Sequence, residues 1–366
     1  MIVGFHSPLP PSPTGVADYS SALLSALRPR AEIKLDSGGA DVCLYHLGNN
    51  ALHRGIYRRA LERPGVVVLH DAVLNHFFLG SLERAQYIGE FVYNYGDWYR
   101  DFAGELWDAR ARSAGDARYF QYPMLRRIVE TSRAVVVHNA AAARLVLAHS
   151  PHARVCEIPH LWAPPPQIPA GAPEKFRRRL GLESRTFLFS VIGYLRESKR
   201  LPVVLKAFDA VHRSGLKAAL LVAGRFVSPD LEAAVAASLD RPGVYRIGWL
   251  PDSDFWPMAA SLDACVNLRY PDAGESSGVA IRLMGLGKAL IVSRTEESSA
   301  FPPSCCLPVA PGIAEQSELL EYMVLLARFP ELAREIGSRG AAHIRECHSL
   351  EAVSEAYWKV LCECRD

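Results

Sequence analysis

The sequence lacks any long hydrophobic run. No stretch of its 366 residues reaches the roughly 18 consecutive apolar residues that a membrane-spanning helix needs. The chain begins MIVGFH, without the basic region, apolar core and cleavage site of a secretory leader. We therefore expect a cytoplasmic protein, with peripheral contact at the inner face of a membrane left open as an alternative.

An excess of either charge is also lacking, as is a metal-type arrangement of cysteines. The 41 Lys and Arg are balanced by 39 Asp and Glu, which excludes attraction of the whole molecule to nucleic acid. The eight cysteines include CC at 305–306 and CEC at 362–364, spacings too short for a CxxC zinc hook. The DSD at 252–254 reads better as solvated turn residues than as a metal-binding carboxylate pair. We expect reduced cysteines and no metal site.

What the sequence does contain is a repeated pattern of strand and helix. Its 49% hydrophobic and 22% charged residues are typical of a globular protein, and its length predicts two domains. Short continuous apolar runs alternate with longer segments of helical period, which indicates α/β halves whose parallel strands are covered by helices on both faces. The predicted strands are 2–5, 42–45, 66–69, 135–137, 187–192, 219–222, 264–268 and 290–292.

The domain boundary is predicted from prolines. The segment IPHLWAPPPQIPAGAP at 158–173 cannot continue a helix or a central strand, so it reads as a linker between domains 1–165 and 166–348. A last helix in 349–366 is expected to pack back on the N-terminal domain. The aromatic-rich region 83–133 is interpreted as a helical insertion. Aromatic side chains in such a region pack in a core about three times as often as they bind an acceptor or a membrane.

The loops that follow the strands are the places to look for chemistry, because ligands of open α/β sheets bind beyond the carboxyl ends of the strands. In NLRYPDAGESSGVAIRLMGLGK, 267–288, a strand and a loop with Glu275 precede a helix. The backbone amides of Ser276, Ser277 and Gly278 would form an anion site at the helix start. Taken alone, such a stretch contains only a helix cap, here at Ser276, about twice as often as it contains an anion site.

A second signal is basic. In VIGYLRESKRLPVVLKAF a strand is predicted to end at Gly193, and the following loop carries Arg196, Lys199 and Arg200. A diphosphate leaving group needs such positive charges because its departure concentrates negative charge. The commoner alternative for an isolated basic loop is a solvated surface.

Two further signals lie in the N-terminal half. Gly15, in a proline-rich loop before an amphipathic helix, allows close backbone approach to a ligand, although the GxGxxG dinucleotide pattern is missing. His70 and Asp71 end one apolar strand, where the imidazole could donate to a sugar hydroxyl or equally be structural. His138 and Asn139 end another strand in the same way, and Asn139 is also explained as a helix cap.

These signals, in this order, resemble glycosyltransferase family 4 over nearly the whole chain. The resemblance implies a GT-B architecture, in which two Rossmann-like domains face a central cleft. It also implies retaining transfer of a hexosyl group from a nucleotide diphosphate sugar to a glycan or lipid-linked acceptor, as in polysaccharide biosynthesis. No cofactor, metal or nucleic-acid partner is expected.

The resemblance also assigns roles to residues. It matches Glu275 to the first glutamate of the E-x7-E motif, which holds donor sugar hydroxyls, Lys199 to the phosphate-binding lysine, and His70 to the cleft histidine. The implied donor-binding residues are Gly15, Arg196, Arg269, Ser276, Ser277, Gly278, Gly248, Leu250 and His138.

The sequence departs from the family pattern at two positions. Leu283, preceded by Arg282, stands where the second, ribose-binding glutamate is usual. Tyr194 stands where an arginine is usual, so Arg196 or Arg269 is expected to supply that charge. GESSG followed by an arginine resembles a variant branch of the family.

Two glycines are predicted to end strands at the edge where the family holds the nucleotide base. They are Gly224 in LLVAGRF and Gly248 in YRIGWL. Backbone contacts from 248–250 to the base are one interpretation, and simple strand termination is the other.

Two other functions remain as alternatives. One is a GT-B scaffold that binds a nucleotide or carbohydrate without transfer. The other is a nucleotide-sugar epimerase, which needs a carboxylate acid and base in its cleft, and Glu275 with Asp71 alone make a weak case for it.

Overall fold

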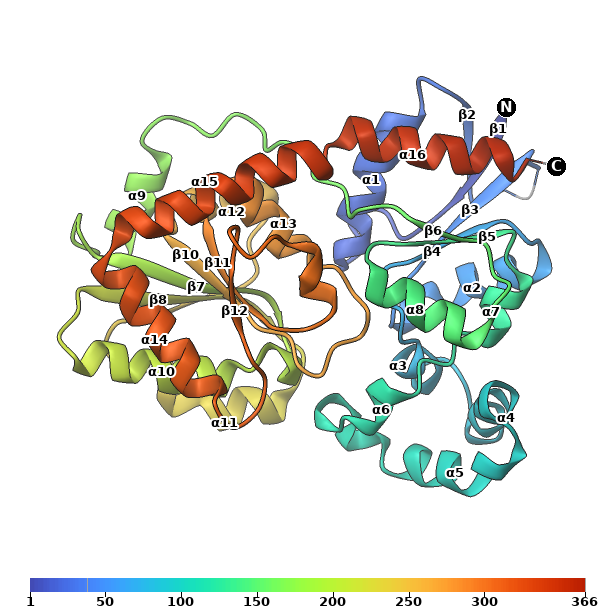
Figure 1. Ribbon diagram of the computed structural model, residues 1–366, viewed down its shortest axis with the longest axis horizontal. Helices are drawn as coiled ribbons and strands as arrows, with labels where there is room; N and C mark the ends of the chain where they lie inside the picture. Colours follow the sequence, from blue (N-terminus) through green and yellow to red (C-terminus); the bar gives the residue numbers. More distant parts are fainter. Residues whose placement is uncertain (38, 366) are drawn as a thin grey trace. The chain divides into compact units, whose positions relative to one another are not determined.

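The computed structural model describes residues 1–37 and 39–365 and contains two six-stranded parallel sheets with helices on their faces (Figure 1). Two compact units are built around these sheets. Unit 1 comprises Met1–Leu161, Pro271–Ser276 and His348–Asp366, and unit 2 comprises Trp162–Tyr270 and Ser277–Cys347. The α/β class predicted from the alternating apolar runs is confirmed.

The strands of unit 1 lie in the order β2-β1-β3-β4-β5-β6. They are β1 (Ile2–His6), β2 (Glu32–Leu35), β3 (Val42–Leu47), β4 (Val66–Leu69), β5 (Ala134–Val137) and β6 (Val155–Glu157). The helices of this unit are α1 (Gly15–Leu27), α2 (Arg54–Glu62), α3 (Asn75–Leu79), α4 (Arg84–Tyr95), α5 (Arg100–Asp108), α6 (Arg118–Gln121), α7 (Arg126–Thr131), α8 (Ala140–His149) and α16 (Leu350–Glu363), with short 3-10 turns η1 (Ala51–His53), η2 (Asp97–Tyr99) and η3 (Arg110–Gly115).

The strands of unit 2 lie in the order β12-β11-β10-β7-β8-β9. They are β7 (Phe187–Leu195), β8 (Ala218–Phe226), β9 (Val244–Ile247), β10 (Ala264–Asn267), β11 (Ala289–Ser293) and β12 (Leu307–Val309). The helices are α9 (Ala172–Arg179), α10 (Leu201–Arg213), α11 (Pro229–Leu239), α12 (Asp252–Ser261), α13 (Gly278–Gly285), α14 (Glu315–Arg328) and α15 (Pro330–Cys347), with η4 (Glu197–Lys199) and η5 (Glu297–Ala300).

The sheet of unit 2 is buried on both faces, which explains why its strands read as continuous apolar runs. Successive side chains of a strand point to opposite faces. In β7, Phe187, Phe189 and Val191 pack with residues of α10, α11 and α14, whereas Leu188 and Ile192 pack with residues of α9, α12 and α13 (Figure 1). Each face therefore has its own core.

Strands β7 and β8 run two residues past the glycines at which the sequence predicted their ends. Gly193 and Gly224 are paired across the two strands, and their φ angles are +106° and +140°. A Cβ on Gly224 would lie 1.9 Å from the carbonyl oxygen of Gly193, so only glycine fits there. These glycines mark a close backbone approach inside the sheet rather than the ends of the strands.

The region 83–133 of unit 1 is helical and contributes most of its aromatic side chains to a core. Tyr87, Phe91, Trp107 and Tyr119 are buried there. Trp98 differs, since 95% of its surface is exposed. The core interpretation therefore holds for most of the aromatic stripe.

The last helix, α16, packs on α1 within unit 1. The hydroxyl groups of Tyr19 and Tyr357 lie 2.8 Å apart and are fully buried. Ion pairs of Arg30 with Glu355 and of Arg154 with Glu363 flank this contact at the surface. The final segment of the chain thus completes the N-terminal unit.

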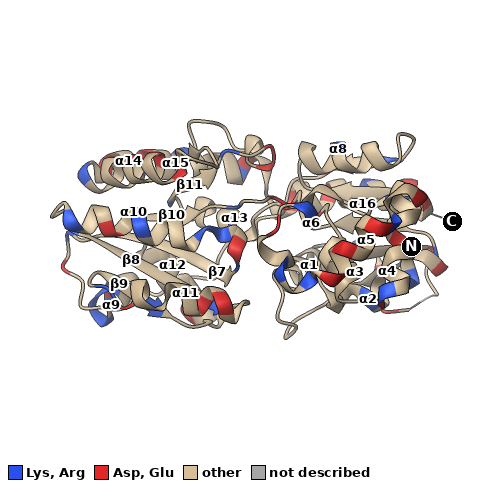
Figure 2. Cartoon of the chain, turned by 90° about the horizontal axis from the view of Figure 1, so that it is seen from below, with Lys and Arg blue, Asp and Glu red and all other residues tan. Residues whose placement is uncertain are grey.

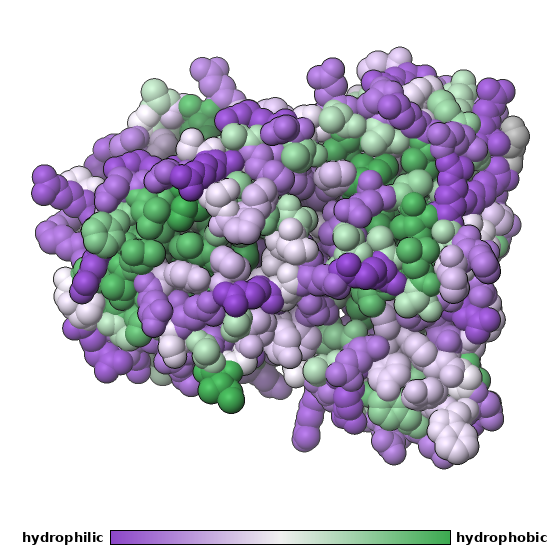
Figure 3. Space-filling view, viewed as in Figure 1, coloured by the Kyte–Doolittle hydropathy of each residue, from purple (hydrophilic) through white to green (hydrophobic). Residues whose placement is uncertain are grey.

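Charged residues of both signs are interspersed along the helices of both units (Figure 2). The face of each unit seen in Figure 3 carries hydrophilic residues between smaller hydrophobic areas. Within the described ranges, no helix is both long and apolar enough to cross a membrane.

We expect Tyr357→Phe to destabilise the protein by about 1–3 kcal/mol, because the Tyr19 hydroxyl would stay buried without a partner. Replacing both tyrosines by phenylalanine removes both polar groups and should restore most of the loss. Urea unfolding of the single and double variants measures both effects. A double variant as unstable as two independent losses would contradict this account.

Candidate functional site

A buried lysine lies at the edge of the unit 2 sheet where the carboxyl ends of its strands meet. Lys199, at the end of η4, is 5% exposed, and its Nζ donates to the carbonyl oxygen of Ile192 at 2.8 Å. Burial, together with the nearby positive charges of Arg269 and Arg196, lowers its pKa to about 7. An ammonium group in this position gains electrostatically from any anion that comes beside it.

The lysine lies next to the start of helix α13. A Cβ on Gly193 would lie 3.8 Å from the Lys199 Nζ and 3.5 Å from a methyl group of Val279. The missing Cβ therefore keeps open the space between the lysine and the first turn of the helix.

Helix α13 is capped by Ser277, not by Ser276. The Ser277 hydroxyl accepts from the backbone N–H of Ala280 at 3.2 Å and from Nη2 of Arg269 at 3.2 Å, and it donates to Oδ1 of Asn267 at 3.3 Å. This side chain therefore has its hydrogen-bonding capacity filled within the protein. A ligand at the helix start would therefore contact backbone N–H groups, such as that of Gly278, and not the Ser277 hydroxyl.

Arg200 has a different role from its neighbours in the basic loop. Its φ of +56° places it in the left-handed region, and its guanidinium makes a bidentate ion pair with Glu315, from Nη2 to Oε2 at 2.6 Å and from Nε to Oε1 at 3.2 Å. Glu315, at the start of α14, is 2% exposed. This pair anchors the turn after Lys199 to the body of unit 2.

An aromatic pair joins the last residues of β7 to the segment after β9. The rings of Tyr194 and Trp249 are 5.0 Å apart, and the Arg196 guanidinium lies 5.8 Å from the Tyr194 ring. Trp249, between Gly248 and Leu250, is 55% exposed. Tyr194, which stands where the family usually has an arginine, thus makes an aromatic contact, and the guanidinium of Arg196 lies over its ring.

The position of the second family glutamate lies in the core. Leu283 is fully buried, and Arg282 beside it lies over the rings of Phe255 and Trp256 at 5.6 and 5.7 Å. A residue at 283 therefore faces the interior, so this chain offers no carboxylate there.

The loop that carries Glu275 belongs to unit 1. The backbone N–H of Ala72 donates to the carbonyl oxygen of Ala273 at 2.9 Å, and the Asn139 side chain donates to the carbonyl oxygen of Gly274 at 3.3 Å. Glu275 itself is half-buried. Ser277, which caps α13, follows Glu275 by two residues in the sequence.

Three buried histidines form a hydrogen-bonded chain in unit 1. His138 Nδ1 donates to the carbonyl oxygen of Ile158 at 2.9 Å, and His138 Nε2 lies 3.3 Å from His70 Nδ1. His70 Nε2 in turn lies 3.0 Å from His46 Nδ1. Burial lowers the pKa of His46 and His70 well below 6.5 and that of His138 to about 4, so all three are neutral at pH 7.

The carbonyl group at one end fixes the tautomer of every ring in this chain. Because His138 carries its proton on Nδ1, its Nε2 accepts from His70, and His70 Nε2 then accepts from His46. Neither ring nitrogen of His70 is left for a substrate hydroxyl in this arrangement. The structural alternative that the sequence left open for His70 fits this geometry.

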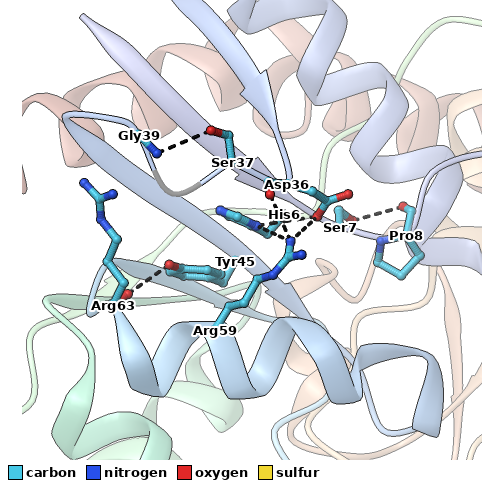
Figure 4. Close-up of polar contacts among 9 residues, drawn as sticks. All are labelled: His6, Ser7, Pro8, Asp36, Ser37, Gly39, Tyr45, Arg59 and Arg63. Carbon is cyan, nitrogen blue, oxygen red and sulfur yellow. Dashed lines mark hydrogen bonds and ion pairs between the residues drawn. The ribbon is translucent and has the colours of Figure 1, made fainter.

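The same edge of the sheet gathers histidines from five strands. They are His6 at the end of β1, His46 in β3, His70 and His138 directly after β4 and β5, and His160 after β6. His6 lies beside Asp36 and Arg59 and stacks on Tyr45 at 4.7 Å (Figure 4). Sequence reasoning found only His70 and His138, although a histidine near the end of successive apolar runs was a usable signal.

Two remaining sequence expectations concern Gly15 and metals. Gly15 is the first residue of α1, and a Cβ there would meet nothing within 4 Å. Across the described part of the chain, no group of three His, Cys, Asp or Glu residues could hold a metal ion. Helix α12 begins at Asp252, whose side chain lies outside the described residues.

No family model and no curated protein sequence matches this chain, whereas solved structures do. Sucrose-phosphate synthase from Thermosynechococcus elongatus superposes with a TM-score of 0.69 at 15% identity, over 99% of this chain and 98% of that one. HepE from Anabaena, solved with UDP and glucose, gives a TM-score of 0.69 at 12% identity, over 99% of this chain and 100% of that one.

WaaG, described as a glycosyltransferase involved in lipopolysaccharide biosynthesis, gives a TM-score of 0.60 at 14% identity, over 99% of both chains. At these identities the likeness shows the fold. The architecture is that of the GT-B glycosyltransferases.

We expect the protein to lose stability as the pH falls below about 6.5. The folded protein keeps His46, His70 and His138 neutral, so between their lowered pKa values and 6.5 the unfolded chain binds more protons. In that pH range, each buried histidine lowers the free energy of unfolding by about 1.4 kcal/mol for every unit by which the pH falls.

Urea unfolding at pH 7.5 and pH 5.5 measures this effect. His46→Gln should reduce the difference between the two pH values, whereas the same change at the exposed His152 should not. An unfolding midpoint that stays the same at both pH values would contradict the neutral histidine chain.

Proposed function

We propose that this protein is a glycosyltransferase that moves a hexosyl group from a nucleotide diphosphate sugar to a glycan or lipid-linked acceptor. We further propose that it retains the anomeric configuration and belongs with the family 4 enzymes, in the branch that carries GESSG. The observation that carries the proposal is Lys199, a buried cation beside two arginines and a helix start.

This arrangement suits a diphosphate. Removing an ammonium group from water is unfavourable unless a counter-charge compensates it, and the neighbouring Arg269 and Arg196 make the positive charge harder to hold. A diphosphate supplies the missing negative charge, and the free amides at the start of α13 suit its distal phosphate. HepE, which has the same fold, was solved with UDP, which supports this class of ligand.

The same residues would stabilise the reaction. When the bond between the anomeric carbon and the diphosphate oxygen breaks, negative charge develops on the leaving group, and a protonated Lys199 and the helix amides can stabilise it. Glu275 holds hydroxyl groups of the donor sugar, and the acceptor oxygen attacks the face from which the diphosphate leaves. The acceptor oxygen bonds directly to the anomeric carbon as the diphosphate leaves, so no covalent adduct between sugar and protein forms. The proton of the acceptor hydroxyl passes to the leaving diphosphate.

We also propose that the donor binds without a metal ion. Lys199, Arg196 and Arg269 supply the positive charge that a divalent cation supplies in other diphosphate sites. On this proposal the nucleoside binds beside Gly248 and Leu250, which follow the end of β9.

Nucleotide affinity should fall as the pH rises above 7. The free protein has a Lys199 pKa of about 7, and a bound diphosphate raises it, so binding takes up a proton above pH 7. We expect the affinity for UDP, or for whichever nucleoside diphosphate binds, to drop about tenfold per pH unit above 7 until the raised pKa is reached.

Calorimetry between pH 7.5 and 9 tests this expectation. Lys199→Met should weaken binding about 10- to 150-fold and remove the pH dependence. The matched control is Lys175→Met, which changes an exposed lysine on α9 and should alter neither quantity. Unchanged affinity in a folded Lys199→Met protein would remove this lysine from the site.

The direct test of the function is sugar release from UDP-, GDP- and ADP-sugars in the presence of a chelator. We expect slow hydrolysis of one donor by the wild-type protein and faster turnover when an acceptor is added. Glu275→Gln should lower turnover by about 100-fold or more while the affinity for the free nucleoside diphosphate is kept, because that ligand lacks the sugar.

Three results would count against parts of the proposal. Binding without any sugar release would favour the scaffold function. A strict requirement for magnesium or manganese would contradict the metal-free site. A glycosyl adduct on Glu275, detected by mass spectrometry, would show that this residue is a nucleophile.

A further inference from the structure

We infer that Asn139 is a positioning residue that holds the loop on both sides of Glu275, through the backbone of Gly274 and the side chain of Ser276. The inference rests on the proposed function, because it concerns the residue to which that function gives the donor sugar. It depends on contacts inside unit 1, which contains both Asn139 and the loop Pro271–Ser276.

The Asn139 side chain uses each of its polar atoms. Its Oδ1 accepts from the backbone N–H of Ala142 at 2.8 Å, which caps helix α8. Its Nδ2 donates to the carbonyl oxygen of Gly274 at 3.3 Å and to the hydroxyl of Ser276 at 3.1 Å. Asn139 is 1% exposed, so these contacts are shielded from water.

A helix cap alone does not need this side chain. The cap requires only an oxygen acceptor, which aspartate, serine or threonine would also supply. Asparagine adds two N–H donors, and here they reach the residues immediately before and after Glu275. The amide group therefore acts on the loop in addition to capping the helix.

The neighbouring contacts hold the same loop. The Ser276 hydroxyl lies 3.4 Å from the carbonyl oxygen of His138, to which it donates, and Ala273 accepts from the backbone of Ala72. Gly274 has a φ of +67°, and a Cβ there would lie 2.6 Å from the Cβ of Ala72. The residues around Glu275 are thus seated closely on the segments that follow β4 and β5.

The consequence for Glu275 is a fixed starting point for its side chain. A carboxylate that holds a sugar hydroxyl contributes to turnover only if it is in place before the reaction, and displacements of about 1 Å cost up to about 100-fold. Asn139 provides this placement without needing to touch the substrate.

Asn139→Asp separates the two roles of the side chain. Aspartate has nearly the same shape, keeps the oxygen that caps α8, and carries a negative charge that suits a helix N-terminus. It loses both donors and turns an oxygen toward the carbonyl group of Gly274. We expect the variant to be less stable, because its buried carboxylate faces that carbonyl group, but to stay folded and to keep its affinity for free nucleoside diphosphate. Turnover of the nucleotide sugar should fall about 10- to 100-fold.

A double variant tests whether the effect acts through Glu275. In the Glu275→Gln background, Asn139→Asp should change turnover less than threefold, because the carboxylate that it positions is already gone. The matched control is Asn50→Asp, which changes another asparagine cap of unit 1 and should leave turnover unchanged. Should Asn139→Asp fail to fold, Asn139→Ser also keeps a cap oxygen and lacks the amide donors.

The outcomes separate this inference from the proposed function. Full turnover by a folded Asn139→Asp protein, or losses that multiply in the double variant, would overturn the positioning role while leaving the glycosyltransferase intact. If the wild-type protein releases no sugar from any donor, the proposed function fails, and the positioning role fails with it.

Discussion

A parallel sheet brings the carboxyl ends of all its strands to one edge, and both clusters of polar residues in this protein depend on that constraint. In unit 2 the constraint gathers Lys199, Arg269 and Ser277 from segments that follow β7 and β10. In unit 1 it gathers histidines from five strands that span more than 150 residues of sequence. The helices bury both faces of each sheet, so this edge is where backbone and side chains stay available for polar contacts.

The buried basic side chains of the two clusters differ in their hydrogen-bond partners and in the charges around them. The histidines of unit 1 stay neutral because burial disfavours the charged ring, and His70 and His138 each donate to one group and accept from another. Their chain ends on the carbonyl group of Ile158. Lys199 has only the carbonyl group of Ile192 and lies among other cations. The histidine chain is held in its neutral form by contacts inside the protein, whereas Lys199 gains from an anion supplied from outside. This contrast is why we place the diphosphate on unit 2.

The sequence was sufficient to predict features that follow from local pattern. Continuous apolar runs predicted the buried strands, and the loops after them pointed to Lys199 and to the start of α13. The short strands β2 (EIKL), β6 (VCE) and β12 (LPV) were missed because they lie at sheet edges and bury less apolar surface. The ends of β7 and β8 were misplaced because the paired glycines looked like strand terminators.

Other features could not be predicted because they depend on partners distant in the sequence. Arg200 belongs to the anchoring pair with Glu315, which lies 115 positions away. Asn139 was seen as a cap, but its second role needs a loop 135 positions away. The satisfied state of His70 likewise depends on strand order, because His46 and His138 come from the two strands beside β4. The identity of a residue and the spacing of its neighbours in the sequence carry no information about contacts between distant segments.

The return of α16 to unit 1 has a consequence for the order in which the chain can fold. A ribosome delivers the first 161 residues early, yet the loop at 271–276 and the helix that covers α1 are made only after most of unit 2. Until then the Tyr19 hydroxyl and the apolar face of α1 lack their native cover. Unit 2 is complete at residue 347, so the contacts of α16 that complete unit 1 can form only after all of unit 2 has been synthesised.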